Sequence, residues 1–204
     1  MERLTFLPRI YLLSFSGRFL IMSSPNILEP IWESYLTTVD CLKVASRSIE
    51  RNELHLMNKT KFVGSAVDEA KLMIHDSRTN ADDFVIVSLW AIFERKLLEY
   101  VQVEGRKLLQ STPTTFNTQV HQKVENEIEY WKSLDVLDLF KTVVGSDLIG
   151  NAKQIKKYRD WIAHKNPRKG APSNVPPQAA YKILSDIIST VEQHPGLIQS
   201  VTAP

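Results

Sequence analysis

The chain has 204 residues, of which 43% are hydrophobic and 24% charged, and its formal net charge is +2. This balance is that of an ordinary globular domain and excludes a chain too polar to bury a core. The single cysteine, Cys41, excludes an intramolecular disulfide and a zinc site built from several cysteines, and it fits a reducing cytoplasm.

Residues 1–22 are rich in apolar side chains, but Arg9, Gly17 and Arg18 interrupt the apolar stretch. The stretch is therefore too short for a membrane span and weak as a signal peptide, and we expect no membrane association. We interpret residues 1–24 as an N-terminal extension. Either Met22 is the true start of the protein, or the extension packs on the domain or on a partner.

Between residues 25 and 195 apolar side chains recur at helical spacing, which predicts one all-helical domain. The expected architecture is an up-and-down helical bundle with additional helices, followed by a short tail at residues 196–204. The predicted helices cover residues 27–50, 62–74, 80–109, 116–132, 134–144, 146–164 and 178–194.

Particular residues indicate where some of these helices begin or end. Asn80-Ala81-Asp82-Asp83 is a plausible helix start, because acidic groups there are favoured by the helix dipole. The β-branched run Val85–Val87 allows a short strand as the competing local structure. Residues 51–60 fit either a loop or a continued helix, and Gly145 is well placed to end a helix.

The segment that carries chemistry lies at the end of the helix predicted for residues 146–164. Arg159 lies beside an apolar stripe, and an arginine at a core edge needs a partner because an unpaired buried charge is costly. His164 follows five residues later, about 140° around an ideal helix. The two side chains therefore meet only if the last turn loosens before Pro167 or if a second copy of the chain supplies the facing half of a cleft. The stripe consists of Leu148, Ala152, Ile155, Tyr158 and Ile162.

Arg159 and His164 form an R-x4-H pattern that resembles the R-x4–6-H motif of the HEPN superfamily. In that superfamily the motif lies on a late helix of an α-helical bundle, with a polar residue after the arginine. Asp160 has this place here, whereas asparagine is common in the family. The segment Ser88–Arg95 also looks like part of this group, and the resemblance extends more weakly over residues 27–194.

The resemblance implies a metal-independent endoribonuclease, a hydrolase without a cofactor, that leaves a 2′,3′-cyclic phosphate and a 5′-hydroxyl. It implies that His164 is the general base or acid, since histidine exchanges protons near neutral pH, and that Arg159 stabilises the charge of the transition state. It further implies a homodimer with facing motif helices, a role as a toxin or phage-defence effector, and an antitoxin or defence-system partner protein.

Three residues besides Arg159 and His164 are candidates for supporting roles in this site. Asp160 either orients His164 or pairs with the lysine one turn before it. Glu94 on the central helix either forms a salt bridge with Arg159 or is a solvated charge. Tyr158 fits the core better than a base-stacking position.

Basic side chains surround the motif. Residues 151–170 carry seven lysines and arginines against one aspartate, a net charge of +6. This favours contact with a polyanion such as RNA, and the alternative is a solvated helix face followed by a basic loop. No histidine or cysteine spacing indicates a metal site. The candidates for contacts with RNA phosphates are Lys157, Lys165, Arg168 and Lys169.

Two other functions stay open. One is a non-catalytic HEPN module that binds RNA, a nucleotide or a protein partner through the same arginine and histidine. The other is a structural helical adaptor, in which Arg159 is held in an ion pair and His164 caps the helix C-terminus. Full engagement of Arg159 by Glu94, with no open cleft near His164, would favour the adaptor.

Overall fold

The computed structural model of the protein describes residues 26–164, 170, 172–195 and 197. This part of the chain is mostly helical and contains no strand, so the all-α prediction is confirmed. The predicted N-terminal extension lies outside the described residues, as does the predicted tail apart from Leu197. The helices are α1 (Glu29–Glu50), α2 (Leu54–Met57), α3 (Val67–Lys107), η1 (Leu108–Gln110), α4 (Thr114–Glu127), η2 (Ile128–Tyr130), α5 (Ser133–Leu139), α6 (Lys141–Val144), α7 (Ser146–His164) and α8 (Pro177–Gln193).

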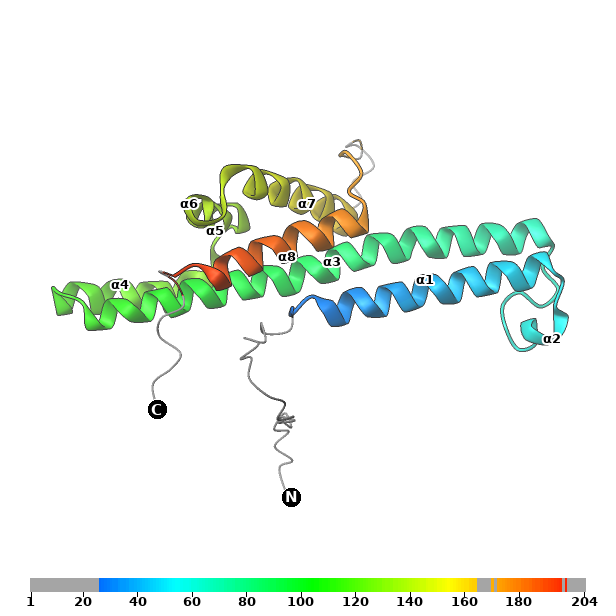
Figure 1. Cartoon of the computed structure of the whole chain (residues 1–204), viewed down its shortest axis with the longest axis horizontal. Coiled ribbons are helices and arrows are strands. Elements are labelled where there is room, and N and C mark those ends of the chain that lie inside the picture. Colours follow the sequence, from blue (N-terminus) through cyan, green and yellow to red (C-terminus); the bar gives the residue numbers. More distant parts are fainter. Residues whose placement is uncertain (1–25, 165–169, 171, 196, 198–204) are drawn as a thin grey trace, which may run out of the picture.

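Four long helices, α1, α3, α7 and α8, form the body of the fold, and successive ones run in opposite directions (Figure 1). The helix α3 runs nearly the whole length of the molecule and contacts the other three. Of the shorter helices, α2 comes between α1 and α3 in the chain and the others come between α3 and α7. The helix α4 packs back against the C-terminal part of α3. None of the described helices is both long enough and apolar enough to span a membrane.

The helix α3 is continuous over 41 residues, where the sequence predicted two helices with a break at residues 76–80. The predicted helix start at Asn80–Asp83 is wrong, because its carboxylates bind other side chains instead of capping backbone N–H groups. Asp82 accepts a hydrogen bond of 2.7 Å from Tyr35 of α1, and Asp83 accepts one of 3.0 Å from Tyr158 of α7. The alternative strand at Val85–Val87 is also wrong, since these residues lie within α3.

Other boundaries agree more closely with the prediction. The bounds of α1, α7 and α8 fall within two residues of those expected from apolar spacing. The helix predicted for residues 134–144 is divided at Phe140 into α5 and α6, and α2 lies in the segment that fitted either a loop or a helix. Gly145 ends α6 with a backbone φ of 99°, a conformation that residues other than glycine rarely adopt.

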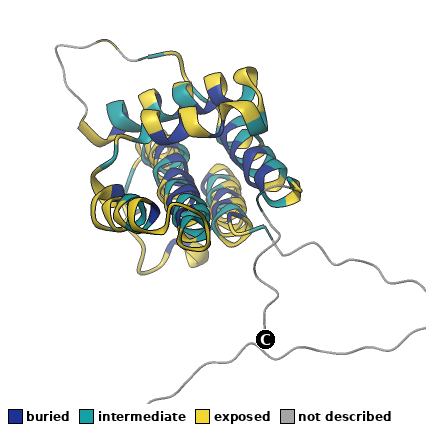
Figure 2. Cartoon of the chain, turned by 90° about the vertical axis from the view of Figure 1, so that its left-hand side faces the viewer, coloured by how far each residue is buried: buried dark blue, intermediate teal, exposed yellow. Residues whose placement is uncertain are grey.

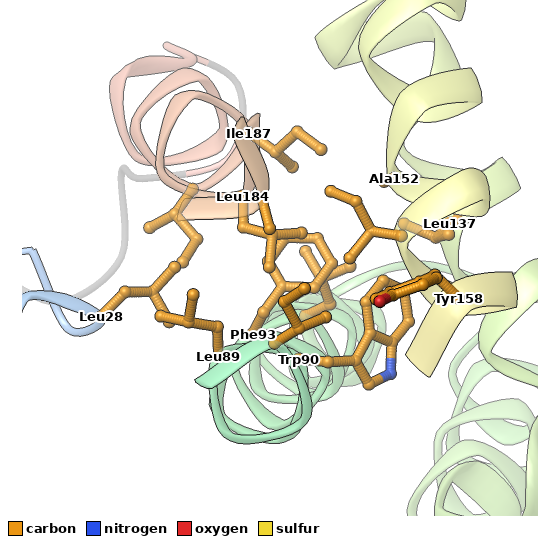
Figure 3. Close-up of a cluster of buried hydrophobic side chains, with 14 of the residues drawn as sticks. Leu28, Leu89, Trp90, Phe93, Leu137, Ala152, Tyr158, Leu184 and Ile187 are labelled. Atoms are coloured by element: carbon orange, nitrogen blue, oxygen red, sulfur yellow. The ribbon is translucent and has the colours of Figure 1, made fainter. Parts of the chain in front are cut away.

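The core lies where α3 meets α7 and α8. Phe93 of α3 and Leu184 and Ile187 of α8 are fully buried, and Leu28 closes the cluster from the start of α1 (Figure 3). In the view of Figure 2 the buried faces of the helices point toward one another, with exposed residues outside. Burial of each such side chain contributes about 1.5–3 kcal/mol to folding.

Tyr35 of α1 and Tyr158 of α7 tie their helices to carboxylates of α3. Tyr35 donates to Asp82 and also accepts a hydrogen bond of 3.0 Å from Arg78. Burial raises the pKa of Tyr35 to about 12, and its hydrogen bond to Asp82 adds to the shift. Burial likewise raises the pKa of Tyr158 to about 12, together with its hydrogen bond to Asp83.

These shifts predict a loss of stability at high pH. A phenol with a raised pKa in the folded state contributes stability that is fully present below pH 10, its unfolded pKa, and is lost as the pH rises toward about 12. We expect the free energy of unfolding, measured by urea denaturation, to fall over this range. Replacing Tyr35 and Tyr158 together with Phe should flatten that fall. Tyr130→Phe, at an 86% exposed position, should leave it unchanged, and a double variant with the wild-type pH dependence would contradict the assignment.

Candidate functional site

The candidate site is built on α7. This helix follows the turn at Gly145, and its buried face fixes how the remaining side chains are directed. The stripe predicted from the sequence is present with one change, because Ile149 is buried in the first turn whereas Leu148 is only partly buried. The buried residues of α7 are Ile149, Ala152, Ile155, Tyr158 and Ile162.

Arg159 lies at the edge of this buried face, as its spacing predicts. Its side chain is 28% exposed, and its Nη2 lies 3.6 Å from Glu94 Oε2 on α3. Its Nη1 donates a hydrogen bond of 3.1 Å to Asp160. The Nε atom is buried and has no hydrogen-bond acceptor among the residues that the structure describes. The guanidinium is therefore held between two carboxylates but keeps donors that are not fully used.

Asp160 belongs to a row of charges along α7. Lys156 donates a hydrogen bond of 2.6 Å to Asp160, so the lysine one turn earlier is its partner. No hydrogen bond joins Asp160 to His164 within the described chain. Asp160 therefore positions cations in this structure.

His164 is exposed and is the last residue of α7. The helix does not loosen before it, so convergence with Arg159 through an unwound last turn is not found. On a regular helix, side chains five residues apart diverge by about 140° and their Cα atoms lie about 7.5 Å apart along the axis. One copy of α7 therefore does not direct both side chains to one point.

The charge around α7 is more balanced than the sequence suggested. Within residues 151–164 four cations stand against Asp160, a net of +3. Lys153 lies 2.7 Å from Asp138, and Glu94 faces Arg159, so four cations meet three carboxylates, a net of +1. Lys157 is exposed and has no acidic partner in the described structure. The other candidates for phosphate contacts, Lys165, Arg168 and Lys169, lie outside the described residues.

Tyr158 is a core residue. It is 8% exposed and packs in the main buried cluster, where its ring stacks on Trp161 with centroids 5.9 Å apart. Because its hydroxyl binds Asp83, Tyr158 supports the site by fixing α7 against α3.

A cavity of about 290 Å³ lies next to Glu94, between α3, η2 and α5. Ser133, the first residue of α5, donates a hydrogen bond to Glu94 Oε1. Sequence reasoning missed Ser133, because it lies 39 residues from its partner and carries no local signal. It also missed Trp90, which lines the same cavity and whose buried Nε1 has no hydrogen-bond acceptor among the described residues. The cavity is thus joined to α7 through the ion pair of Glu94 with Arg159.

No three His, Cys, Asp or Glu side chains gather closely enough to hold a metal ion in the part of the chain that the structure describes. Comparisons with family models, with curated proteins and with solved structures found no match. The chemistry available at this site is that of an exposed imidazole at a helix end and a guanidinium at a core edge.

Proposed function

We propose that this chain is a metal-independent endoribonuclease of HEPN type, acting as a toxin or phage-defence effector. The observation that carries the proposal is the placement of Arg159 and His164. Arg159 is held at the core edge by Glu94 and Asp160, and His164 is exposed five residues beyond it. A guanidinium that is fixed in place and still has unused donors suits a phosphate oxygen.

The active site forms between two copies of the chain in this proposal. Because Arg159 and His164 diverge on one straight helix, each site combines Arg159 of one copy with His164 of the other. Two facing α7 helices in a symmetric dimer produce two such sites.

The reaction is an internal transesterification. His164 takes the proton of the 2′-hydroxyl, the 2′-oxygen bonds to phosphorus, and the bond from phosphorus to the 5′-oxygen breaks. The leaving 5′-oxygen takes up a proton, and Arg159 stabilises the negative charge that builds on the phosphoryl oxygens. The products are a 2′,3′-cyclic phosphate and a 5′-hydroxyl.

Mapping the ends of cleaved RNA tests this proposal. Incubation of total RNA with the purified chain in the presence of a metal chelator should give 2′,3′-cyclic phosphate and 5′-hydroxyl ends. The His164→Ala chain, purified in the same way, should give none above background. Cleavage by both chains at the same rate would show that a contaminant or another site is responsible.

A non-catalytic module that binds RNA, a nucleotide or a protein partner is the second candidate. The balance of charges at Arg159 favours it, because Arg159 and Lys156 face Glu94 and Asp160, two cations against two carboxylates. RNA binding that depends on Arg159, without cleavage across a broad set of RNAs, would support this function over the first.

A further inference from the structure

The cavity next to Glu94 has the features of a small ligand site. Its volume of about 290 Å³ is at the lower end for small-molecule pockets, which suits one planar ring system better than a large cofactor. Its wall combines apolar side chains of α3 and α5 with the half-buried ring of Trp131. Arg95 and Glu129 form an ion pair of 2.5 Å at its exposed side.

Two residues that line the cavity have unmatched hydrogen-bonding capacity. Trp90 is 1% exposed, and its Nε1 has no acceptor within the described part of the chain. Figure 3 shows this nitrogen at the rim of the apolar cluster. Glu94 Oε1 accepts a hydrogen bond from Ser133. Among the residues that the structure describes, Glu94 Oε2 has only the ion-pair contact of 3.6 Å with Arg159. Buried polar groups are nearly always paired, so an unpaired donor beside an open carboxylate points to a bound group.

Trp90 and Glu94 lie on one face of α3. Residues four apart on a helix are neighbours, and both residues line the cavity. A ligand that satisfies both must present an acceptor next to donors along one edge. Nucleobases that are splayed out of single-stranded RNA present such edges and stack on aromatic side chains.

We propose that this cavity binds a guanine base of the RNA substrate, an inference that rests on the proposed ribonuclease function. The guanine O6 accepts from Trp90 Nε1, and the guanine N1–H and N2–H donate to the Glu94 carboxylate. Guanine is the base that offers a carboxylate two neighbouring donors beside an acceptor, whereas adenine, cytosine and uracil each offer it one. Because Glu94 also contacts Arg159, a bound base would be placed next to the phosphate that Arg159 holds.

Binding of the four nucleoside 5′-monophosphates measures this preference directly. They share sugar and phosphate, so differences in affinity report the base. By calorimetry we expect GMP to bind at least about tenfold more tightly than AMP, CMP or UMP. Trp90→Phe keeps an aromatic ring but removes the donor, and Glu94→Gln removes the carboxylate. Each should weaken GMP binding about tenfold and reduce the preference over the other bases.

Glu104→Gln is the matched control. Glu104 lies on the same helix, its side chain is 33% exposed against 28% for Glu94, and it too pairs with a cation, Lys107. We expect this variant to bind GMP like the wild type. Ser133→Ala gives a second measurement should Trp90→Phe or Glu94→Gln fail to fold. It removes the hydrogen bond that holds Glu94 Oε1 in place without changing the charge, so the carboxylate loses its fixed position and GMP binding should also weaken.

The outcomes separate this site from the proposed function. Equal affinity for all four nucleotides, no GMP binding at millimolar concentration, or GMP binding unchanged in both Trp90→Phe and Glu94→Gln would overturn the guanine site. The His164→Ala chain should keep the GMP preference whether or not the wild type cleaves RNA. A GMP preference without RNA cleavage would support the guanine site and contradict the ribonuclease function. RNA cleavage without a GMP preference would support the ribonuclease function and contradict the guanine site.

Discussion

An equimolar mixture of Arg159→Ala and His164→Ala chains is expected to recover about a quarter of the wild-type RNA cleavage, although each variant alone loses it. The proposed site takes Arg159 from one copy and His164 from the other. In a mixed dimer one of the two sites then has both residues and the other has neither. Random pairing makes about half of the dimers mixed, and half of the sites in those are intact.

Each variant alone should lose most of its activity. Removing a general acid or base typically lowers a rate about 10²–10⁴-fold, and removing a donor to the charge of the transition state lowers it about 10²–10³-fold. Recovery on mixing therefore stands well above the activity of either variant. A fluorescent RNA cleavage assay, with both chains at matched concentration, measures it.

A chain that carries both substitutions is the control for this mixing. Combined with the Arg159→Ala chain it supplies no Arg159, and combined with the His164→Ala chain it supplies no His164, so neither mixture should recover. Variants that form mixed dimers without any recovery would show that the two residues do not act across the dimer. Full activity from a chain that stays monomeric in sedimentation would lead to the same conclusion.

Apolar periodicity predicts most of the fold because it reports which face of a helix is buried. It places α1, α7 and α8 within two residues of their bounds. It fails at residues 76–83, where several polar side chains follow one another and resemble a helix boundary. The carboxylates of this segment are satisfied by Tyr35 and Tyr158, which lie 47 and 75 residues away in the chain. Contacts of such sequence separation leave no local pattern.

The candidate site, too, could be predicted only in part from the sequence. The position of Arg159 at the core edge follows from the spacing of the buried residues around it. The ion pair of Arg159 with Glu94 does not follow from this spacing, because the sequence allowed Glu94 to be either paired or solvated. The cavity and the contact of Ser133 with Glu94 depend on how α5 packs against α3, and no periodic pattern encodes that packing.

Truncation of Phe93 is expected to cause the largest loss of stability from a single substitution in α3. Phe93 is fully buried, and its ring contacts that of Trp90 with centroids 5.4 Å apart. Replacing a buried phenylalanine with alanine removes its burial and leaves a cavity, which costs about 3–5 kcal/mol. Urea denaturation followed by circular dichroism should show this decrease in the free energy of unfolding.

Phe84→Ala is the matched control, because it is the same substitution in the same helix with the same gain in helix propensity. Phe84 is 64% exposed, so its truncation should change the free energy of unfolding by about 0.5 kcal/mol or less. Nine residues turn a helix by about 900°, which places Phe84 and Phe93 on opposite faces of α3. A loss at Phe84 as large as that at Phe93 would mean that α3 buries its other face. Glu94 would then be turned away from Arg159, which would contradict both the proposed Arg159–His164 site and the proposed guanine site.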